Sequence, residues 1–316
     1  MADVVSAGII VVDHVAAPVD HLPAAGELLL TDECFLATGG CASNVAVDLA
    51  KMDVSVSIAG LVGEDSFGVF AKETLAAAGV ETSTLLATSK AATSQTLILN
   101  VKGQDRRFIH HIGANDLFAG RHFPMEAIRK AKLLYVGGFF LMGLRGDELA
   151  AVFKQARAAG VLTMLDVVTP SGGANHLEEL APALVETDVF HLNNDEGRAI
   201  TGKSDPAEQA ELLHRAGARS VVVTTGGEGA VFVSAKERLR AGVYPTEFVD
   251  GTGGGDAFDA GFIVGLLRGG DPRRCLELGS ALGASCVRKS GATAGVFTAA
   301  EAEAFLRSHR LTVTSF

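Results

Sequence analysis

The sequence contains no tryptophan and only two tyrosines among its 316 residues. Basic residues are also scarce, because 27 Lys and Arg stand against 37 Asp and Glu, which gives a formal net charge of −10. No run of Lys and Arg is longer than two residues. Nucleic-acid binding needs a basic patch and, for single strands, aromatic rings on which bases stack. We therefore expect no nucleic-acid partner.

Cysteines and long apolar runs are few. The four cysteines, Cys34, Cys41, Cys275 and Cys286, form no Cys-x-x-Cys pair, and we interpret them as reduced thiols in a cytoplasmic chain. No run of about 18 apolar residues is present, so we expect no membrane span. The first residues, MADVVSAGIIVVDHV, lack a positive region, which favours a first strand over a signal peptide.

Apolar strand-like runs alternate with helical patterns, and 48% of the residues are hydrophobic. The strand-like runs lie at 4–12, 54–60, 95–101, 107–112, 132–137, 161–166, 188–193, 220–225 and 230–234, and the helical patterns at 43–51, 66–78, 146–159, 194–201 and 205–216. From about residue 113 onward the alternation is regular. This order predicts an α/β fold with a mostly parallel sheet covered by helices on both faces.

Two stretches break this alternation. Residues 14–36 hold two prolines and a strand-like segment at 28–31, and residues 93–112 hold two strand candidates around a turn at 102–105. They predict a small antiparallel sheet laid over a main domain as a lid. The main domain then consists of residues 1–13, 37–92 and 113–316.

One glycine-rich segment, residues 197–204, formally matches the P-loop pattern GxxxxGK[ST]. A P-loop follows a strand directly, whereas NNDEGRAIT has the pattern of a short helix. We interpret Gly202 as the C-cap of that helix and Ser204 or Asp205 as the N-cap of the next one. The competing interpretation is a phosphate site at Lys203.

A second segment, TTGGEG at 224–229, follows the apolar strand-like run SVVVTT. Another apolar run follows it where a dinucleotide fold needs a helix, so the sequence argues against a nicotinamide-dependent oxidoreductase. The segment is either a plain β-turn or a turn whose glycines let a nucleotide lie against the backbone.

The third segment, Asp250-Gly251-Thr252-Gly253-Gly254-Gly255-Asp256, runs directly into a helical pattern. A glycine-rich helix N-terminus binds anions through its free N–H groups and the helix dipole. The Asp256 carboxylate would repel a phosphate there unless it served as a general base for an attacking hydroxyl. The structural alternative is that Asp256 caps the helix.

Near the N-terminus, Thr38-Gly39-Gly40-Cys41-Ala42-Ser43-Asn44 precedes another helical pattern. Ser43 or Asn44 is either the N-cap of this helix or, for Asn44, a hydrogen-bonding group for a polar ligand. Asp13 ends the first apolar run, at the strand end where parallel sheets bind ligands. A sugar with several hydroxyls would satisfy both Asp13 and Asn44.

In these motifs the sequence resembles the ribokinase-like, or PfkB-type, sugar kinases over nearly the whole chain. GGCASN at 39–44 is similar to the family's GGxxxN, and DGTGGGD at 250–256 resembles its DTxGAGD. Between them, 63–68 looks like GxDxxG, 193–196 matches NxxE, and 224–229 matches TxGxxG. The resemblance implies a ribokinase-like three-layer α/β/α fold with a β-sheet lid.

The resemblance also implies roles for individual residues. Asp256 would be the catalytic base, and Gly253, Gly254 and Gly255 would form the anion hole. Asp13, Gly39, Gly40 and Asn44 would hold the sugar; Thr224, Gly226, Gly229 and Ser280 would line the nucleotide; Asn193 and Glu196 would handle Mg²⁺ and phosphate largely through water. Asp250 and Thr252 are candidates for a monovalent cation such as K⁺. In many members the lid also forms a homodimer interface.

The sequence departs from the family at several positions. Gly251 and Gly254 replace the usual Thr and Ala, which should loosen the anion-hole loop, and Ser280 stands where many relatives carry an Asn near the adenine.

We therefore expect an ATP-dependent kinase that phosphorylates a primary hydroxyl of a small sugar. One alternative is a nucleoside kinase with a base slot formed by Phe35, Phe108, His110 and His111. The other is a non-catalytic sugar-binding paralogue, against which the presence of Asp256 argues.

Overall fold

A ten-stranded sheet forms the centre of the molecule in the computed structural model, which describes residues 2–16, 18–104, 107–170 and 176–316. Its strand order is β14-β13-β12-β11-β10-β9-β8-β1-β4-β5. The bounds are β1 (Val4–Gly8), β4 (Val56–Gly63), β5 (Leu85–Thr88), β8 (Leu133–Phe139), β9 (Leu162–Val167), β10 (Val189–Asn193), β11 (Ser220–Thr224), β12 (Ala230–Ser234), β13 (Arg238–Ala241) and β14 (Val313–Ser315). The strands from β5 to β11 in this order pair in parallel, and β12 to β14 are antiparallel. The predicted, mostly parallel sheet is confirmed.

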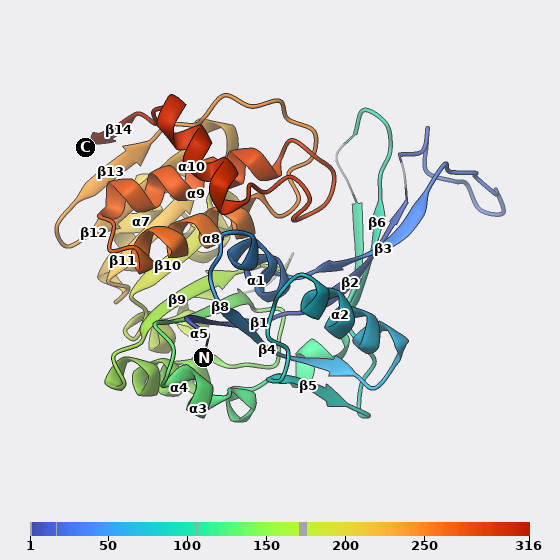
Figure 1. Cartoon of the computed structure of the whole chain (residues 1–316), viewed down its shortest axis with the longest axis horizontal. Coiled ribbons are helices and arrows are strands. Elements are labelled where there is room, and N and C mark those ends of the chain that lie inside the picture. Colours follow the sequence, from blue (N-terminus) through green and yellow to red (C-terminus); the bar gives the residue numbers. More distant parts are fainter. Residues whose placement is uncertain (1, 17, 105–106, 171–175) are drawn as a thin grey trace.

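Helices cover both faces of this sheet, so the fold has three layers (Figure 1). One layer holds α1 (Cys41–Lys51), α2 (Ser66–Ala77), α8 (Gly254–Leu267), α9 (Pro272–Cys286) and α10 (Ala299–Ser308). The other holds α3 (Met125–Ile128), α4 (Gly146–Ala158), α5 (His176–Leu184), α6 (Asn194–Thr201) and α7 (Pro206–Arg215). Successive residues of β1, such as Val4 and Val5, belong to different core clusters, as expected for a strand buried on both faces.

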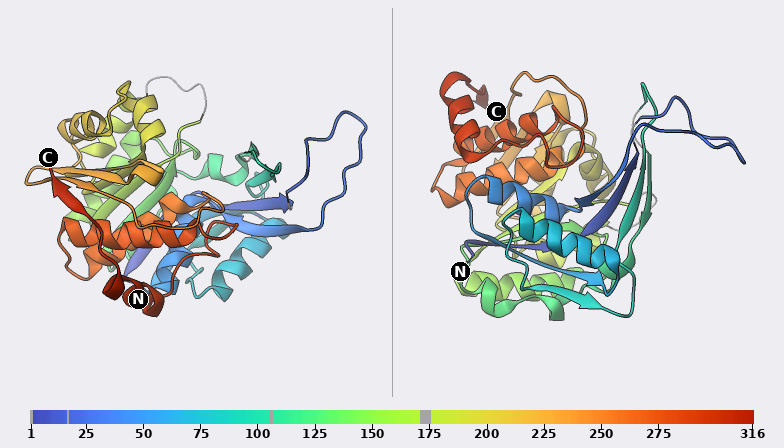
Figure 2. Two further views of the ribbon diagram at one scale, coloured as in Figure 1. Left: turned by 90° about the horizontal axis from the view of Figure 1, so that it is seen from above. Right: turned by 45° about the vertical axis from the view of Figure 1, so that its right-hand side comes forward.

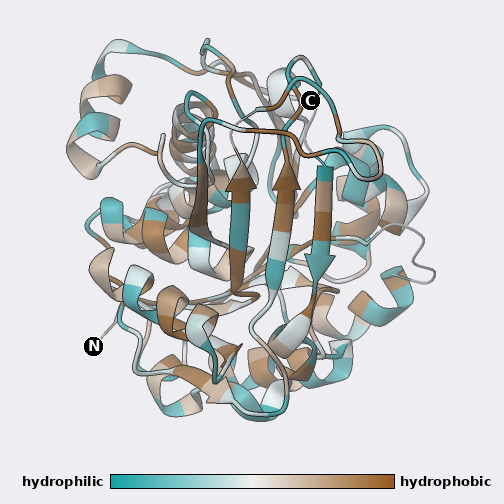
Figure 3. Cartoon of the chain, turned by 90° about the vertical axis from the view of Figure 1, so that its right-hand side faces the viewer, coloured by the Kyte–Doolittle hydropathy of each residue, from teal (hydrophilic) through white to brown (hydrophobic). Residues whose placement is uncertain are grey.

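A second, four-stranded sheet lies beside the main domain, in the order β3-β2-β6-β7 (Figures 1 and 3). Its strands are β2 (Val11–Ala16), β3 (Cys34–Gly39), β6 (Gln95–Leu99) and β7 (Arg107–His111). Two of its strand pairs are antiparallel, and β2 pairs with β6 in parallel. Residues 18–33, between β2 and β3, project away from both sheets (Figure 2). The lid sheet predicted from 14–36 and 93–112 is therefore present, and its strands extend to Val11 and Gly39.

The strand predicted over 4–12 is wrong as a single element, because the chain changes sheets within it. β1 ends at Gly8 and β2 begins at Val11. Between them, the Asn115 side chain accepts from the Ile10 N–H at 3.2 Å and donates to the Ile10 carbonyl at 3.1 Å. A buried amide thus satisfies the backbone where the ladder of neither sheet does. A continuous apolar run carries no sequence signal of such a transfer.

The structure differs from the prediction in two further respects. Residues 28–31 form no strand, and Leu28 and Leu30 are 87% and 85% exposed. Asp105, the last residue of the predicted turn at 102–105, lies outside the described residues. The strands β3, β5, β13 and β14 and the helices α3, α5, α9 and α10 were not predicted.

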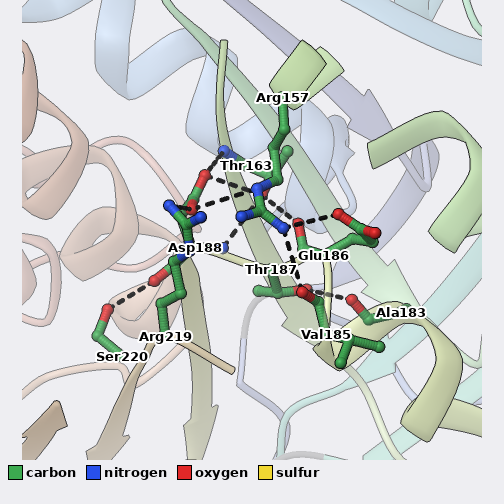
Figure 4. A network of polar contacts seen from close by, with 9 residues as sticks. All are labelled: Arg157, Thr163, Ala183, Val185, Glu186, Thr187, Asp188, Arg219 and Ser220. Atoms are coloured by element: carbon green, nitrogen blue, oxygen red, sulfur yellow. Dashed lines mark hydrogen bonds and ion pairs between the residues drawn. The ribbon is translucent and has the colours of Figure 1, made fainter. Parts of the chain in front are cut away.

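The amino-terminal ends of β9, β10 and β11 are joined by a buried polar network (Figure 4). The Asp188 carboxylate accepts from the Thr163 N–H at 3.0 Å and pairs with Arg219 at 2.9 Å and Arg157 at 3.6 Å. Arg157 also pairs with Glu186 at 2.6 Å. This network fixes the sheet at the edge opposite the glycine-rich motifs. No helix in the described part of the chain is long and apolar enough to cross a membrane.

Candidate active site

The glycine-rich motifs meet at the carboxyl-terminal edge of the parallel strands, where open α/β sheets bind ligands. Helix α8 begins there after Gly253, whose φ of 74° is left-handed. A Cβ at Gly253 would lie 2.2 Å from the Ala292 carbonyl oxygen, so this turn admits only glycine. No side chain caps the helix; the Gly254 N–H donates to the Gly251 carbonyl at 3.3 Å, and the Gly255 N–H is left available to an anion.

Asp256 lies in this first turn and contacts helix α1 rather than capping α8. Its Oδ2 accepts a hydrogen bond from Asn44 Nδ2 at 2.7 Å. Burial is the main cause that raises the pKa of Asp256 to about 6; the hydrogen bond from Asn44 opposes the rise, and Asp259 adds to it. Asn44 is buried, and its Oδ1 has no hydrogen-bond partner among the described residues. The Asp256 carboxylate of α8 and the Asn44 amide of α1 therefore meet at the same point of the sheet edge.

The paired glycines before α1 admit a second carboxylate. Gly40 precedes the helix with a φ of 91°, and a Cβ at Gly39 would lie 2.1 Å from Asp13 Oδ2. Burial raises the pKa of Asp13 to about 6, against the effect of Thr96 and His14. The N-cap interpretation of Ser43 and Asn44 is wrong, because Gly40 is the N-cap and no side chain caps α1.

The candidate P-loop is a junction between two helices. Residues Asn194–Thr201 form α6, Gly202 ends it in the left-handed conformation, and Asp205 caps α7 by accepting from the N–H groups of Ala207 and Glu208. Lys203 is exposed and lies 3.9 Å from Glu208. The helix–turn–helix interpretation of the sequence is confirmed.

Asn193 and Glu196 form the capping box of α6. Asn193 Oδ1 accepts from the N–H groups of Asp195 and Glu196, and Glu196 Oε2 accepts from the Asn193 N–H at 2.8 Å. Burial raises the pKa of Glu196 to about 7, opposed by the bond to Asn193. The two residues thus start the helix, and Glu196 presents a carboxylate at the sheet edge.

The TTGGEG segment connects β11 to β12 through a short 3₁₀ turn, Gly226–Glu228. Gly226 has a φ of 57° and open space where a Cβ would lie. A Cβ at Gly229 would instead lie 2.0 Å from the Ala241 carbonyl oxygen, so the absence of a side chain there serves strand packing. Thr224 ends β11 at the sheet edge, and Ser280 lies in the middle of α9.

The loop before α8 is held by Asp250. Its Oδ1 accepts from the N–H and hydroxyl of Thr252 at 2.8 and 2.7 Å, and its Oδ2 accepts from the Gly291 N–H at 3.0 Å. Cys286 Sγ donates to the carbonyl oxygens of Thr252 and Ala292.

Several residues at this edge were missed by the sequence analysis: Tyr135, Asp166, His191 and Asp259. His191 Nδ1 lies 2.7 Å from Asp259 Oδ1 and 3.8 Å from Asp166 Oδ1. Burial lowers the pKa of His191, but Asp259 and the other carboxylates raise it, and the net shift is upward. Each of these polar residues lies within an otherwise apolar segment, which is the sequence signal that was available.

The arrangement of the chain is that of the ribokinase-like kinases. The ribokinase of Arabidopsis thaliana complexed with ribose and ATP superposes with a TM-score of 0.82 at 24% identity, covering 96% of this chain and 98% of that one. A putative ribokinase from Agrobacterium tumefaciens gives a TM-score of 0.85 at 22% identity, with 97% of both chains covered. At these identities the likeness establishes the fold.

The chain belongs to the PfkB family of carbohydrate kinases, because residues 1–299 match the pfkB family carbohydrate kinase profile. It is 29% identical over 311 residues to the ribokinase of Haemophilus influenzae, covering 95% of this chain and 96% of that one. It is 31% identical over 294 residues to the ATP-dependent ribose-1-phosphate kinase of Halopiger xanaduensis, covering 92% and 94%. The protein is therefore a phosphotransferase whose acceptor is a hydroxyl group.

Proposed function

We propose that this carbohydrate kinase transfers the γ-phosphoryl group of ATP to a primary hydroxyl of a small sugar, with Asp256 as the general base. The observation that carries the proposal is the contact of Asp256 with Asn44 at 2.7 Å, in front of the uncapped, glycine-rich start of α8. A carboxylate with a pKa of about 6 is ionised at pH 7 and still basic enough to take a proton.

In this mechanism Asp256 accepts the proton of the sugar hydroxyl as its oxygen bonds to the γ-phosphorus. The bond between that phosphorus and the bridging oxygen breaks, and ADP leaves with the electron pair. The N–H group of Gly255, and that of Gly254 once it gives up its bond to the Gly251 carbonyl, stabilise charge on the transferring group. Asn44 and Asp13 hold the sugar hydroxyls, beside the backbone of Gly39 and Gly40.

Mg²⁺ with ATP fits the residues at the sheet edge. Glu196, Asp166 and Asp256 have raised pKa values, and a divalent cation would relieve the repulsion among their carboxylates. We propose that Asn193 and Glu196 handle Mg²⁺ largely through water. When bound, the ion neutralises charge on the triphosphate. An E. coli putative ribokinase II of the same fold (TM-score 0.80) has been solved in complex with ATP and Mg²⁺.

The nucleotide is proposed to lie along Thr224, Gly226 and Gly229, with Ser280 near the adenine. The open space at Gly226 supports a close approach of the nucleotide to the backbone. Gly229 supports the proposed nucleotide site indirectly, because its conformation shapes the turn beside which the nucleotide would lie.

A monovalent cation is proposed for the loop that contains Asp250 and Thr252. The loop offers the Asp250 carboxylate and the carbonyl oxygens of Thr252 and Ala292, which are oxygen donors of the kind that K⁺ takes. Activity in KCl is compared with activity in tetramethylammonium chloride at equal ionic strength. Equal rates would refute the site.

The smaller sheet is proposed to be a lid and a homodimer interface. Its exposed residues Leu36, Leu97 and Ile109 lie in one cross-strand row with His14. An apolar row of this kind is costly to leave in water. Light scattering of the protein and of an L97D variant tests the interface, because the variant should be monomeric. A monomeric wild type would refute it.

A nucleoside kinase is the second candidate. Phe35, Val15, Ile98 and Phe108 form one cross-strand row, and Asp13, Thr96 and His110 lie in a neighbouring row on the same face. An apolar slot beside a carboxylate suits a base joined to a ribose. His111 pairs with Gln95 and alternates to the opposite face, so it is no part of this slot.

A coupled assay of ADP release over a substrate panel decides between the candidates. The panel contains ribose, fructose, ribose 1-phosphate, tagatose, 2-keto-3-deoxygluconate and nucleosides. We expect turnover with one of the sugars and its loss in D256N. Turnover with nucleosides alone would support the second candidate, and no turnover with saturable sugar binding would support a binding protein.

A further inference from the structure

A chain of buried polar contacts runs beneath the candidate active site, from the core of the sheet to the nucleotide turn. Tyr135 of β8 donates its hydroxyl to Asp259 Oδ2 at 3.0 Å. Asp259 Oδ1 lies 2.7 Å from His191 Nδ1 in β10. His191 Nε2 lies 3.3 Å from the Thr224 hydroxyl, where β11 ends. The contacts thus link three strands through one residue of α8.

These side chains are held rigidly. The His191 and Asp259 side chains are 3% and 0% exposed. The His191 ring stacks on Phe258 with centroids 5.2 Å apart and an interplanar angle of 21°. A Cβ at Gly255 would lie 3.8 Å from His191 Cε1, so the ring faces the first turn of α8. The stack on Phe258 therefore restrains the His191 ring against this helix.

Asp259 lies three residues after Asp256 on α8, nearly one helical turn away. A contact at Asp259 therefore fixes the rotation of α8 about its axis, and with it the direction of the Asp256 carboxylate. The same imidazole holds the hydroxyl of Thr224. One side chain consequently sets the distance between the base and the nucleotide turn.

We propose that His191 and Asp259 are positioning residues that align the nucleotide turn with the catalytic helix. The proposal deepens the proposed function and rests on it, since it takes Asp256 as the base and Thr224 as a nucleotide contact. A phosphoryl acceptor and donor must be aligned within a fraction of an ångström for transfer, so loss of this alignment lowers the rate while the sugar still binds.

Two variants of His191 divide its contacts. Asparagine places an amide near the position of Nδ1 and keeps the contact with Asp259; glutamine reaches the position of Nε2 and keeps the contact with Thr224. We expect H191N to raise the KM for ATP by about tenfold, the effect of one lost hydrogen bond. We expect H191Q to lower kcat by about tenfold, because α8 loses its anchor. The KM for the sugar stays unchanged in both.

Two further tests ask whether His191 acts on the kinetic constants through Thr224 and Asp259. T224V removes the contact with His191 together with the direct contact of Thr224 with the nucleotide, so the double variant H191N/T224V should raise the KM for ATP no more than T224V alone. D259N keeps the size and an acceptor oxygen and should restore most of the kcat that D259A loses. The exposed His309 provides a matched control, and H309Q should leave all constants unchanged.

The outcomes separate this proposal from the proposed function. Additive effects of H191N and T224V, or equal changes in the KM values for ATP and sugar, would overturn the positioning role and indicate a general packing defect. If D256N stays active, the assignment of the base fails instead. Calorimetric titration with a non-hydrolysable ATP analogue measures nucleotide affinity without turnover. It therefore tests the contact of His191 with Thr224 whether or not Asp256 is the base.

Discussion

Carboxylates are buried at both the amino-terminal and the carboxyl-terminal edge of the central sheet, but their charge partners differ between the two edges. At the amino-terminal edge Asp188 pairs with two arginines, Arg157 and Arg219, and accepts from the Thr163 backbone (Figure 4). At the carboxyl-terminal edge Asp166, Asp256, Asp259 and Glu196 lie together. Among the described residues, His191 is the ion-pair partner of Asp166 and Asp259, and Asp256 and Glu196 have none.

The difference separates a structural edge from a functional one. Charges that are matched within the chain need nothing from outside, so the Asp188 network stabilises the fold. Unmatched carboxylates with raised pKa values are held at a cost to stability, and such groups cluster at functional sites. Under the proposed function, the carboxyl-terminal edge receives a cation and a proton that arrive with the substrates.

The largest expected effect is that of D256N on turnover. The amide preserves the shape of the side chain but cannot take a proton, so kcat should fall by about 10²–10⁴-fold. ATP affinity should persist or increase, because a negative charge near the triphosphate is removed. Steady-state kinetics and ATP titration measure both quantities.

The control for this prediction is K203A, in the false P-loop motif. Lys203 is exposed between α6 and α7, so its removal should leave kcat and ATP affinity unchanged. If K203A is the damaging variant and D256N is mild, the site lies elsewhere.

A carboxylate-to-amide change should act in opposite directions on stability at the two edges. D188N removes the carboxylate that pairs with Arg219 and one of the two that pair with Arg157, which keeps Glu186, and should lower the free energy of unfolding by about 1–2 kcal/mol. D256N should instead raise the melting temperature at pH 8 by about 2–4 °C. Thermal unfolding of the two variants beside wild type measures this.

The sign for Asp256 follows from its pKa. Burial raises the pKa to about 6, above the value in the unfolded chain, so the stability that it contributes is present at low pH and is lost as the pH rises through about 6. The advantage of D256N should accordingly vanish at pH 4. Destabilisation by D256N at pH 8 would contradict the comparison of the edges.

The same pKa predicts the pH dependence of turnover. Asp256 must be ionised to accept a proton, so kcat/KM for the sugar should fall below about pH 6, tenfold for each further pH unit. Glu196 has a pKa of about 7, so the KM for MgATP should change with pH around pH 7. Rates in overlapping buffers at constant ionic strength test this. A kcat/KM for the sugar that is flat down to pH 4 would argue against Asp256 as the base.

The residues at the carboxyl-terminal edge differ in how well the sequence alone predicts them. Asp256 and Asn44 were found because glycines that start helices leave a local pattern. Tyr135, Asp166, His191 and Asp259 were missed, because each stands alone in an apolar segment and only the strand order brings them together. The fold class followed from the alternation of elements. The transfer of the chain between sheets at Ile9 and Ile10 did not, because Asn115, which enables it, lies 105 residues away.

The smallest expected effect belongs to Cys41, which lies within the functional edge as a neutral group. Its Sγ and carboxylate oxygens of Asp166 and Asp256 lie within 4.8 Å of one another. Burial and both carboxylates raise the pKa of the thiol, so it stays protonated and serves as a donor. C41S keeps a donor at this position and should retain kcat within about threefold, whereas C41A should lose up to about tenfold. Because this edge lacks positive charge rather than hydrogen-bond donors, neither change should approach the effect of D256N. A loss of several orders of magnitude in folded C41S would make the thiol a catalytic group and remove the distinction between charge and donor on which the comparison of the two edges depends.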